Sequence, residues 1–177
     1  MGPQSRAFAE FWSELSMKAI GIDPGLAMTG FGVVESQTRG GRACEWGAIR
    51  TESHWPIQSR LKTIYDELEK LLEKWNPTLL VLEDVFVLNQ FPKAAIQLGE
   101  VRGVIFLAAQ KRAIPVMDVK PTEVKSALTG SGRADKEQVQ KMIRQILKIG
   151  NPVRSSHAGD ALALALTGLS RNGNFRW

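Results

Sequence analysis

The sequence has 177 residues, 44% of them hydrophobic, which fits one domain with a full core and leaves little room for a second. No run approaches the ~18 consecutive apolar residues of a membrane helix, and the first residues lack a signal-peptide pattern. The single Cys44 excludes an internal disulfide or a cysteine zinc site. We therefore expect a cytoplasmic protein without a membrane partner. The net charge of +5 is uneven: residues 101–177 carry 13 Lys and Arg against 5 Asp and Glu, and residues 1–100 carry 10 against 13, so the second half favours a polyanionic partner such as nucleic acid.

The first predicted strand ends in a carboxylate. Residues 18–23 form a short apolar run that stops at Asp23, directly before a Pro-Gly turn. A carboxylate at the end of a core strand needs a metal ion or a basic partner if it is buried, whereas the alternative is a solvated aspartate in an ordinary turn. Met17 stands immediately before this strand and can itself be a start residue, so we expect residues 1–16 to be a disordered extension.

Two further strands, a helix and a fourth strand follow. Residues 29–35 and 43–51 are predicted strands, and the short links between the first three strands predict antiparallel pairing. Residues 58–75 place their apolar side chains on one helical face. Residues 79–83 are a continuous apolar run, as expected for a strand buried on both faces, and this strand also ends in a carboxylate, Glu83.

The segment from 93 to 112 predicts a helix that is apolar almost all round after Val101. Such a helix needs cover on more than one side. The sheet supplies one side, and we predict that a second copy of the chain supplies another, in a homodimer with this helix near the interface. Residues 114–119 are then a short fifth strand.

Three helices complete the basic half of the chain. Residues 121–128 begin with a proline and carry Lys125. A second helix has its apolar face between 139 and 147, and the last begins near residue 155 or 156 and ends at about 169.

Four polar residues form a candidate site. Asp23 and Glu83 each end a strand, and His157 and Asp160 lie three residues apart on one face of the last helix. If the two strands are neighbours under that helix, three carboxylates and an imidazole converge, and such a cluster favours one or two divalent metal ions. Two such ions can catalyse phosphodiester hydrolysis by activating a water molecule and stabilising the leaving oxygen. Taken singly, each residue also has an ordinary alternative as a strand-end acid or a residue of the first helical turn.

Six segments in order resemble RuvC, the bacterial family of Holliday junction resolvases. The resemblance covers residues 17–170, which we expect to be a single RuvC-like nuclease domain, with 171–177 as a tail. The segments are Gly-Ile-Asp-Pro-Gly at 21–25, Glu-Asp-Val-Phe at 83–86, Leu-Gly-Glu-Val-Arg-Gly at 98–103, Pro-Thr-Glu-Val-Lys at 121–125, Lys-Glu-Gln-Val-Gln at 136–140 and His-Ala-Gly-Asp-Ala-Leu-Ala at 157–163.

The resemblance implies an α/β ribonuclease H-like fold, with a five-stranded mixed sheet whose first three strands are antiparallel, flanked by helices. It implies a homodimer that nicks two opposing strands of a four-way DNA junction symmetrically, in recombination and repair. Mg²⁺ or Mn²⁺, two per active site, would be the cofactor, and the RuvA and RuvB branch-migration proteins would be partners.

The resemblance also assigns residues. Asp23, Glu83 and Asp160 fall on metal ligands of the family, while His157 stands where many members have aspartate and others histidine. An imidazole is a softer ligand than a carboxylate, so we expect Mn²⁺ to support activity at least as well as Mg²⁺.

Three more residues match positions of the family that bind DNA. Lys125 and Lys136 match lysines near the active site that would hold the scissile phosphate, with solvated helix surface as the alternative. Phe86 matches an aromatic residue that stacks on an unpaired base near the crossover, with core packing as the alternative.

Other classes explain less of the sequence. An actin-like ATPase would share the first strand and turn but needs a second phosphate loop and a longer chain. A catalytically silent binding module should have lost at least one acid. The shorter RNA-processing relative of RuvC is disfavoured by the length and by the segments around Lys125 and Lys136.

Overall fold

The computed structural model describes residues 17–37, 40–84, 92–150 and 155–171. The extension predicted at 1–16 and the aromatic residue Phe86 lie outside these ranges. The described elements are β1 (Lys18–Asp23), β2 (Met28–Ser36), β3 (Gly41–Arg50), α2 (Ile57–Trp75), β4 (Leu79–Glu83), α3 (Pro92–Lys111), β5 (Val116–Val119), α4 (Pro121–Thr129), α5 (Lys136–Leu147) and α6 (Ser156–Arg171).

The strands form one mixed sheet in the order β3-β2-β1-β4-β5. β1, β2 and β3 are antiparallel neighbours joined by short links, as predicted. β4 runs parallel to β1, and β5 runs parallel to β4. The reason is that α2 and α3 each return the chain to the end of the sheet at which β1 begins. The predicted mixed sheet of the ribonuclease H-like fold is therefore confirmed.

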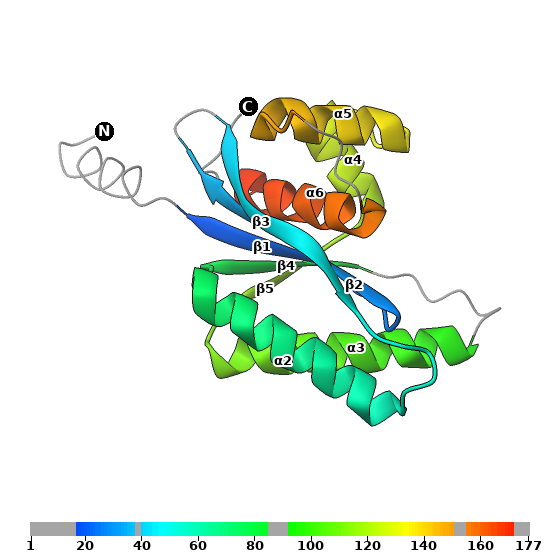
Figure 1. Cartoon of the computed structure of the whole chain (residues 1–177). Helices are drawn as coiled ribbons and strands as arrows, with labels where there is room; N and C mark the ends of the chain where they lie inside the picture. Colours follow the sequence, from blue (N-terminus) through cyan, green and yellow to red (C-terminus); the bar gives the residue numbers. More distant parts are fainter. Residues whose placement is uncertain (1–16, 38–39, 85–91, 151–154, 172–177) are drawn as a thin grey trace.

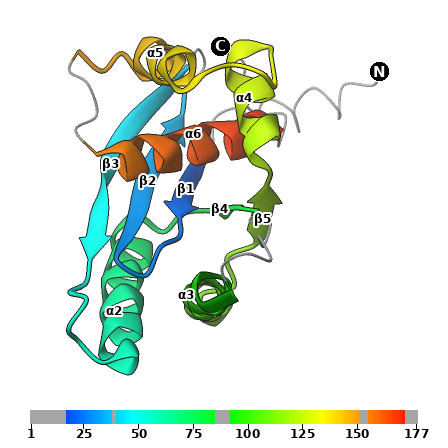
Figure 2. The same ribbon diagram turned by 90° about the vertical axis from the view of Figure 1, so that its right-hand side faces the viewer.

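Helices cover both faces of the sheet. α4, α5 and α6 lie on one side, and α2 and α3 lie on the other (Figures 1 and 2). Side chains alternate along a strand, so Ala19 and Val81 contribute to the core beneath α6, while Ile20 and Leu80 contribute to the core beneath α2 and α3. None of the described helices is both long enough and apolar enough to cross a bilayer.

Several element boundaries differ from the sequence predictions by one or two residues, and two of the differences have an identifiable reason. β5 begins at Val116 instead of 114, because the backbone N–H of Ile114 still donates to Ala109 O at 3.0 Å in the turn that closes α3. α6 extends to Arg171, beyond the predicted end at about 169, and the Arg171 guanidinium donates to Glu123 Oε1 at 2.6 Å. This contact ties the last turn of α6 to α4.

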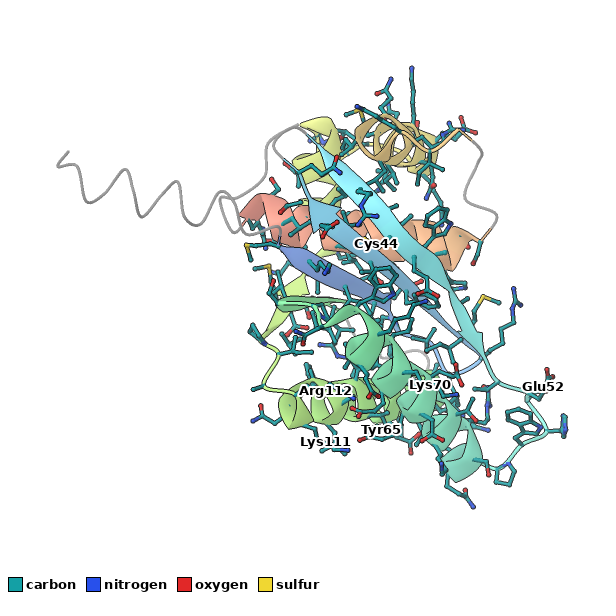
Figure 3. The ribbon with its side chains drawn as sticks, turned by 60° about the vertical axis from the view of Figure 1, so that its left-hand side comes forward. Cys44, Glu52, Tyr65, Lys70, Lys111 and Arg112 are labelled. Atoms are coloured by element: carbon teal, nitrogen blue, oxygen red, sulfur yellow. The ribbon has the colours of Figure 1, made fainter. Side chains whose placement is uncertain are left out.

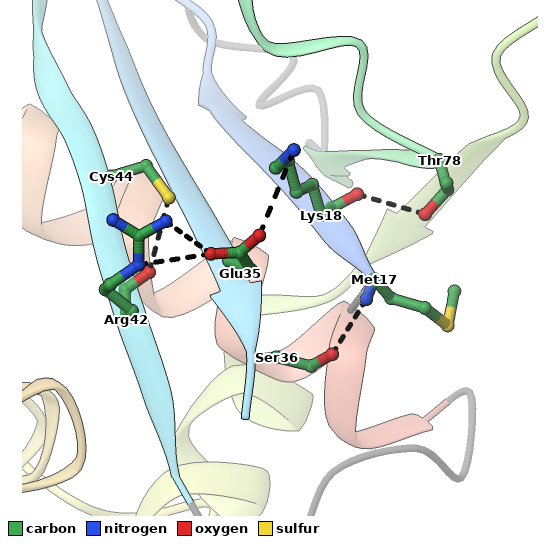
Figure 4. Close-up of polar contacts among 7 residues, drawn as sticks. All are labelled: Met17, Lys18, Glu35, Ser36, Arg42, Cys44 and Thr78. Carbon is green, nitrogen blue, oxygen red and sulfur yellow. Dashed lines mark hydrogen bonds and ion pairs between the residues drawn. The ribbon is translucent and has the colours of Figure 1, made fainter. Parts of the chain in front are cut away.

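Polar contacts join the start of β1 to its neighbours, at the end of the strand opposite Asp23 (Figure 4). Arg42 Nη2 lies 2.5 Å from Glu35 Oε2, and Lys18 Nζ lies 3.9 Å from Glu35 Oε1. The neighbouring Cys44 is half-buried, and desolvation raises the pKa of its thiol. A raised pKa disfavours the nucleophilic thiolate, so Cys44 has the character of a packing residue.

Candidate active site

Two adjacent strands bring the carboxylates of Asp23 and Glu83 to one place. The parallel ladder between β1 and β4 reaches Ile22 and Leu82, so the residues that follow end neighbouring strands. Alternation along β4 puts Glu83 on the same face as Val81, which packs beneath α6. The same alternation along β1 puts Asp23 on that face, so both acids point toward α6.

Two glycines allow α6 to lie directly against the sheet backbone. A Cβ atom on Gly21 would stand 2.0 Å from Ala161 O, and one on Gly30 would stand 2.3 Å from His157 O. Gly30 is also the ladder partner of Asp23. The first turn of α6 therefore rests on the backbone next to Asp23, where any larger residue at position 30 would hold it away.

This close packing places the imidazole of His157 beside Asp23. His157 Nδ1 lies 2.6 Å from Asp23 Oδ2, and the Asp23 side chain is only 13% exposed. Burial raises the pKa of Asp23 above its usual value, although the hydrogen bond and the charge of His157 oppose that rise. When the carboxylate is ionised it accepts a hydrogen bond from Nδ1–H, which leaves the lone pair of a neutral imidazole on Nε2.

Asp160 and Lys136 form the other side of the site. Asp160 lies three residues after His157 in α6, and Lys136 Nζ donates to Asp160 Oδ2 at 3.0 Å. Lys136 is the first residue of α5, and its backbone is held there because the Asp135 side chain caps the helix by accepting from Gln138 N.

The charge of the site acts on Glu83. Burial raises the pKa of Glu83, and the negative charges of Asp23 and Asp160 raise it further. Lys136 and Arg102 oppose the rise. The ionised form of Glu83 is therefore disfavoured, first by burial and then by its two acidic neighbours, and the two cations offset only part of this effect.

A hollow of about 270 Å³ opens at this point between β4, α4, α5 and α6. Its polar lining consists of Glu83, Asp160, Lys125 and Lys136, and the remaining lining residues are apolar apart from backbone groups. Two carboxylates and two ammonium groups therefore face one cavity beside the Asp23–His157 pair.

The structure thus brings six of the seven predicted site residues into one neighbourhood, and the seventh, Phe86, lies outside the described residues. Within the described ranges, no three His, Cys, Asp or Glu side chains are arranged as a complete metal-binding group.

Sequence reasoning missed Gly30 and Arg102. Arg102 of α3 donates through Nη1 to the backbone oxygen of Glu83 and through Nη2 to Asp118 Oδ1 at 2.6 Å. A signal for Arg102 is present in the sequence, because it is a charged residue inside the otherwise apolar run that begins at Val101. Gly30 has no comparable local signal, because only the approach of α6 makes a side chain at that position impossible.

The order of the strands and the acidic cluster at the ends of β1 and β4 define a nuclease of the ribonuclease H-like class. Residues 19–168 match the family model described as "Crossover junction endodeoxyribonuclease RuvC". The chain belongs to the RuvC family of crossover junction endodeoxyribonucleases.

Relatives agree in sequence and in fold. The crossover junction endodeoxyribonuclease RuvC of Thermomicrobium roseum is 40% identical over 153 residues, which are 85% of this chain and 91% of that protein. The Thermus thermophilus RuvC structure is 34% identical with a TM-score of 0.82, covering 89% of this chain and 98% of that one. The structure of T. thermophilus RuvC in complex with a Holliday junction substrate is also 34% identical, with a TM-score of 0.83 and coverage of 89% and 97%.

Proposed function

We propose that this chain is a metal-dependent, structure-selective endonuclease that resolves Holliday junctions by nicking two opposing strands symmetrically, in homologous recombination and DNA repair. Membership of the RuvC family supports the reaction, and the T. thermophilus RuvC bound to a junction substrate supports the substrate. The observation that carries the proposal is the convergence of Asp23 and Glu83 under α6, beside a cavity that Lys125 and Lys136 also line.

The donor atoms of the site are of the chemical kinds that bind Mg²⁺ and Mn²⁺. Asp23, Glu83 and Asp160 offer carboxylate oxygens, and His157 offers an imidazole nitrogen. Burial raises the pKa values of Asp23 and Glu83, and neighbouring carboxylates add to the rise. The ionised form of each acid is therefore disfavoured at this place, and a bound cation would offset that cost. We therefore assign these four residues as the ligands of Mg²⁺ or Mn²⁺, two ions per active site. Bound ions of this kind activate water and stabilise the leaving oxygen of a phosphodiester.

The remaining residues of the site orient these ligands and the DNA. Asp23 holds the His157 ring through Nδ1, a carboxylate–imidazole pairing that fixes the tautomer of a ligating histidine. Lys136 offsets the charge of Asp160 and, together with Lys125, is suited to hold the scissile phosphate and the charge that develops on it. For Phe86 we retain the family role of stacking on an unpaired base at the crossover.

We propose a homodimer with α3 at its interface. Ile96, Phe106 and Leu107 are 65%, 39% and 57% exposed on this helix, and a Cβ atom on Gly99 or Gly103 would meet nothing within 4 Å. The helical repeat places these five residues on one face. An exposed apolar face with two glycines suits close packing against a second copy of the helix. Partnership with RuvA and RuvB is proposed from family membership alone.

The test compares a labelled synthetic four-way junction with a linear duplex that has the same arms. Wild type and Asp23→Asn are each incubated with Mg²⁺, Mn²⁺ or a chelator. We expect paired symmetric nicks in the junction alone, which the chelator and the substitution abolish while binding persists. Junction binding without nicking under either metal would reduce the protein to a junction-recognition module, and cleavage that persists in chelator would contradict the metal assignment.

A further inference from the structure

The guanidinium group of Arg102 links α3 to the end of β4 at the backbone of Glu83. Arg102 donates to the backbone oxygen of Glu83 and to Asp118 Oδ1 of β5. Its guanidinium carbon lies 5.3 Å from the ring centroid of Phe106, and its side chain is only 18% exposed. Two hydrogen bonds and a stacking contact thus restrict this side chain to one orientation.

The backbone oxygen of Glu83 lies where the sheet ladder stops. The last pair between β1 and β4 is Ile22 with Leu82, and the residue that follows the end of β1 at Asp23 is Pro24. Proline has no backbone N–H, so β1 has no donor with which to extend its ladder past Asp23 toward Glu83. The guanidinium of Arg102 supplies a donor to this oxygen instead.

We propose that Arg102 is a positioning residue that fixes the end of β4, and with it the carboxylate of Glu83, relative to Asp23 and α6. The inference rests on the proposed function, in which Glu83 is a metal ligand. β5 contributes the anchor, because Asp118 holds the second nitrogen of the same guanidinium. On the far side of the strand end, Asp84 N–H donates to Val119 O at 2.9 Å, so residues 83 and 84 are held from α3 and from β5 together.

The effect of losing this contact follows from geometry. A catalytic group displaced by about 1 Å can lower the rate by ~10²-fold, and loss of a group that orients a metal ligand lowers metal affinity by ~10–100-fold. The competing explanation is that Arg102 only attaches α3 to the sheet. In that case its loss would lower the stability of the protein and leave the site of each folded molecule intact.

The test uses Arg102→Gln and Arg102→Lys, with Arg112→Gln as the matched control. Arg112 follows the end of α3 and pairs with Glu69 at 3.3 Å and Glu73 at 3.6 Å, in the α2–α3 contact beside Tyr65 and Lys111 (Figure 3). Four quantities are measured on each full-length variant: thermal unfolding, Mn²⁺ affinity by calorimetry, junction binding, and the single-turnover rate of junction cleavage. Hydrogen exchange of individual amides is followed in the metal-free protein.

For Arg102→Gln we expect Mn²⁺ affinity and the single-turnover rate to fall by at least ~10-fold, with junction affinity within about twofold of wild type. The Asp84 amide should exchange faster. The amide of Leu80, which lies in β4 and donates to the oxygen of Pro115 directly before β5, should keep its exchange rate. Arg102→Lys should recover only part of the loss, because one ammonium group cannot reproduce the planar fork that holds two acceptors. Arg112→Gln should change none of these quantities except thermal stability.

Unchanged Mn²⁺ affinity and unchanged Asp84 exchange in Arg102→Gln would overturn the inference, as would equal losses in the Arg112→Gln control. A wild-type protein that neither binds Mn²⁺ nor cleaves the junction would overturn the proposed function and this inference with it. A wild type that does both, beside an Arg102→Gln variant equal to it, would overturn the inference alone.

Discussion

His157 Nδ1 lies 2.6 Å from Asp23 Oδ2, which joins the first turn of α6 to the end of β1 across 134 positions of sequence. The contact exists because Gly30, the ladder partner of Asp23, has no side chain to separate the helix from the sheet. It orients the imidazole and leaves Nε2 as the nitrogen with a lone pair when the ring is neutral.

This nitrogen donor leads to a prediction about metal preference. We expect wild-type cleavage with Mn²⁺ to be at least as fast as with Mg²⁺, because imidazole is a softer ligand than carboxylate. His157→Asp should shift the ratio of the two rates toward Mg²⁺, and His54→Gln, which changes a histidine packed against Trp55 instead, should leave it unchanged. Titrations of each metal on a labelled junction measure the ratio. Clearly slower cleavage by the wild type with Mn²⁺ would contradict the prediction.

Glu83→Gln should raise the stability of the metal-free protein and abolish cleavage. Burial and the neighbouring charges raise the pKa of Glu83 in the folded state, so folding favours its protonated form. The ionised group therefore opposes folding at neutral pH, and this cost disappears as the pH falls below the unfolded pKa, where both states are protonated. Glu83 is only partly buried, so solvent screens part of this cost. We therefore expect a stabilisation of roughly 0.5–1 kcal/mol, which corresponds to a rise of a few degrees in Tm.

The measurement is thermal unfolding in chelator between pH 3.5 and 8, for wild type, Glu83→Gln and Glu67→Gln. Glu67 is an exposed partner of Lys70, and a surface pair contributes little, so Glu67→Gln should behave as the wild type does. A stability gain for Glu83→Gln that is constant across this pH range would show that the charge is not its cause. Addition of Mn²⁺ should stabilise the wild type more than Glu83→Gln.

Lys136→Gln should slow junction cleavage by about 10²–10³-fold while junction binding falls much less. The ammonium group pairs with Asp160 beside the cavity, where a preorganised cation stabilises charge that develops on the phosphate. Lys141→Gln is the control, since Lys141 lies further along α5 and lines a different hollow. Single-turnover rates and gel-shift affinities separate the two effects. Equal losses of rate and binding in Lys136→Gln would identify a general electrostatic contact.

Phe86→Ala should lower junction cleavage and leave the fold intact. Stacking of a base on an aromatic side chain contributes ~1–3 kcal/mol, so a loss of about 5–150-fold is expected if that contact forms at the crossover. Cleavage rates on the junction are compared with far-ultraviolet circular dichroism and Tm. An unchanged rate would dispose of the stacking role, and a large fall in Tm would favour core packing.

Gly103→Asp should convert the proposed homodimer to a monomer without unfolding it. A Cβ atom at this position meets nothing within 4 Å in the single chain. Any residue other than proline is also a better helix former than glycine. A charge at this position would therefore disturb only a neighbouring copy of the chain. Gly150→Asp, at another open glycine outside α3, should remain dimeric. Light scattering at micromolar concentration decides the outcome, and a monomeric wild type would contradict the homodimer.

The local pattern of the sequence determined the elements and their order. The apolar run at 79–83 predicted β4 with its observed bounds, because a strand buried on both faces needs apolar side chains on both. The switch to a helical repeat predicted α2 to within one residue of its start at Ile57. Asp23 and Glu83 were visible because a charge at the end of a buried run stands out. His157 and Asp160 were visible because a spacing of three residues puts them on one face at the start of the last helix.

Only the tertiary structure decided how these residues meet. The spacing of Asp23 and Glu83 depends on β4 entering the sheet beside β1 in parallel register, and the contact with His157 depends on α6 crossing the backbone at Gly21 and Gly30. Local periodicity reports which face of an element is apolar, but the same faces are compatible with several strand orders and helix positions. The packing of α6 on β1 and of Arg102 against Glu83 selects one of them, because contacts between residues distant in sequence form only when the whole core is assembled.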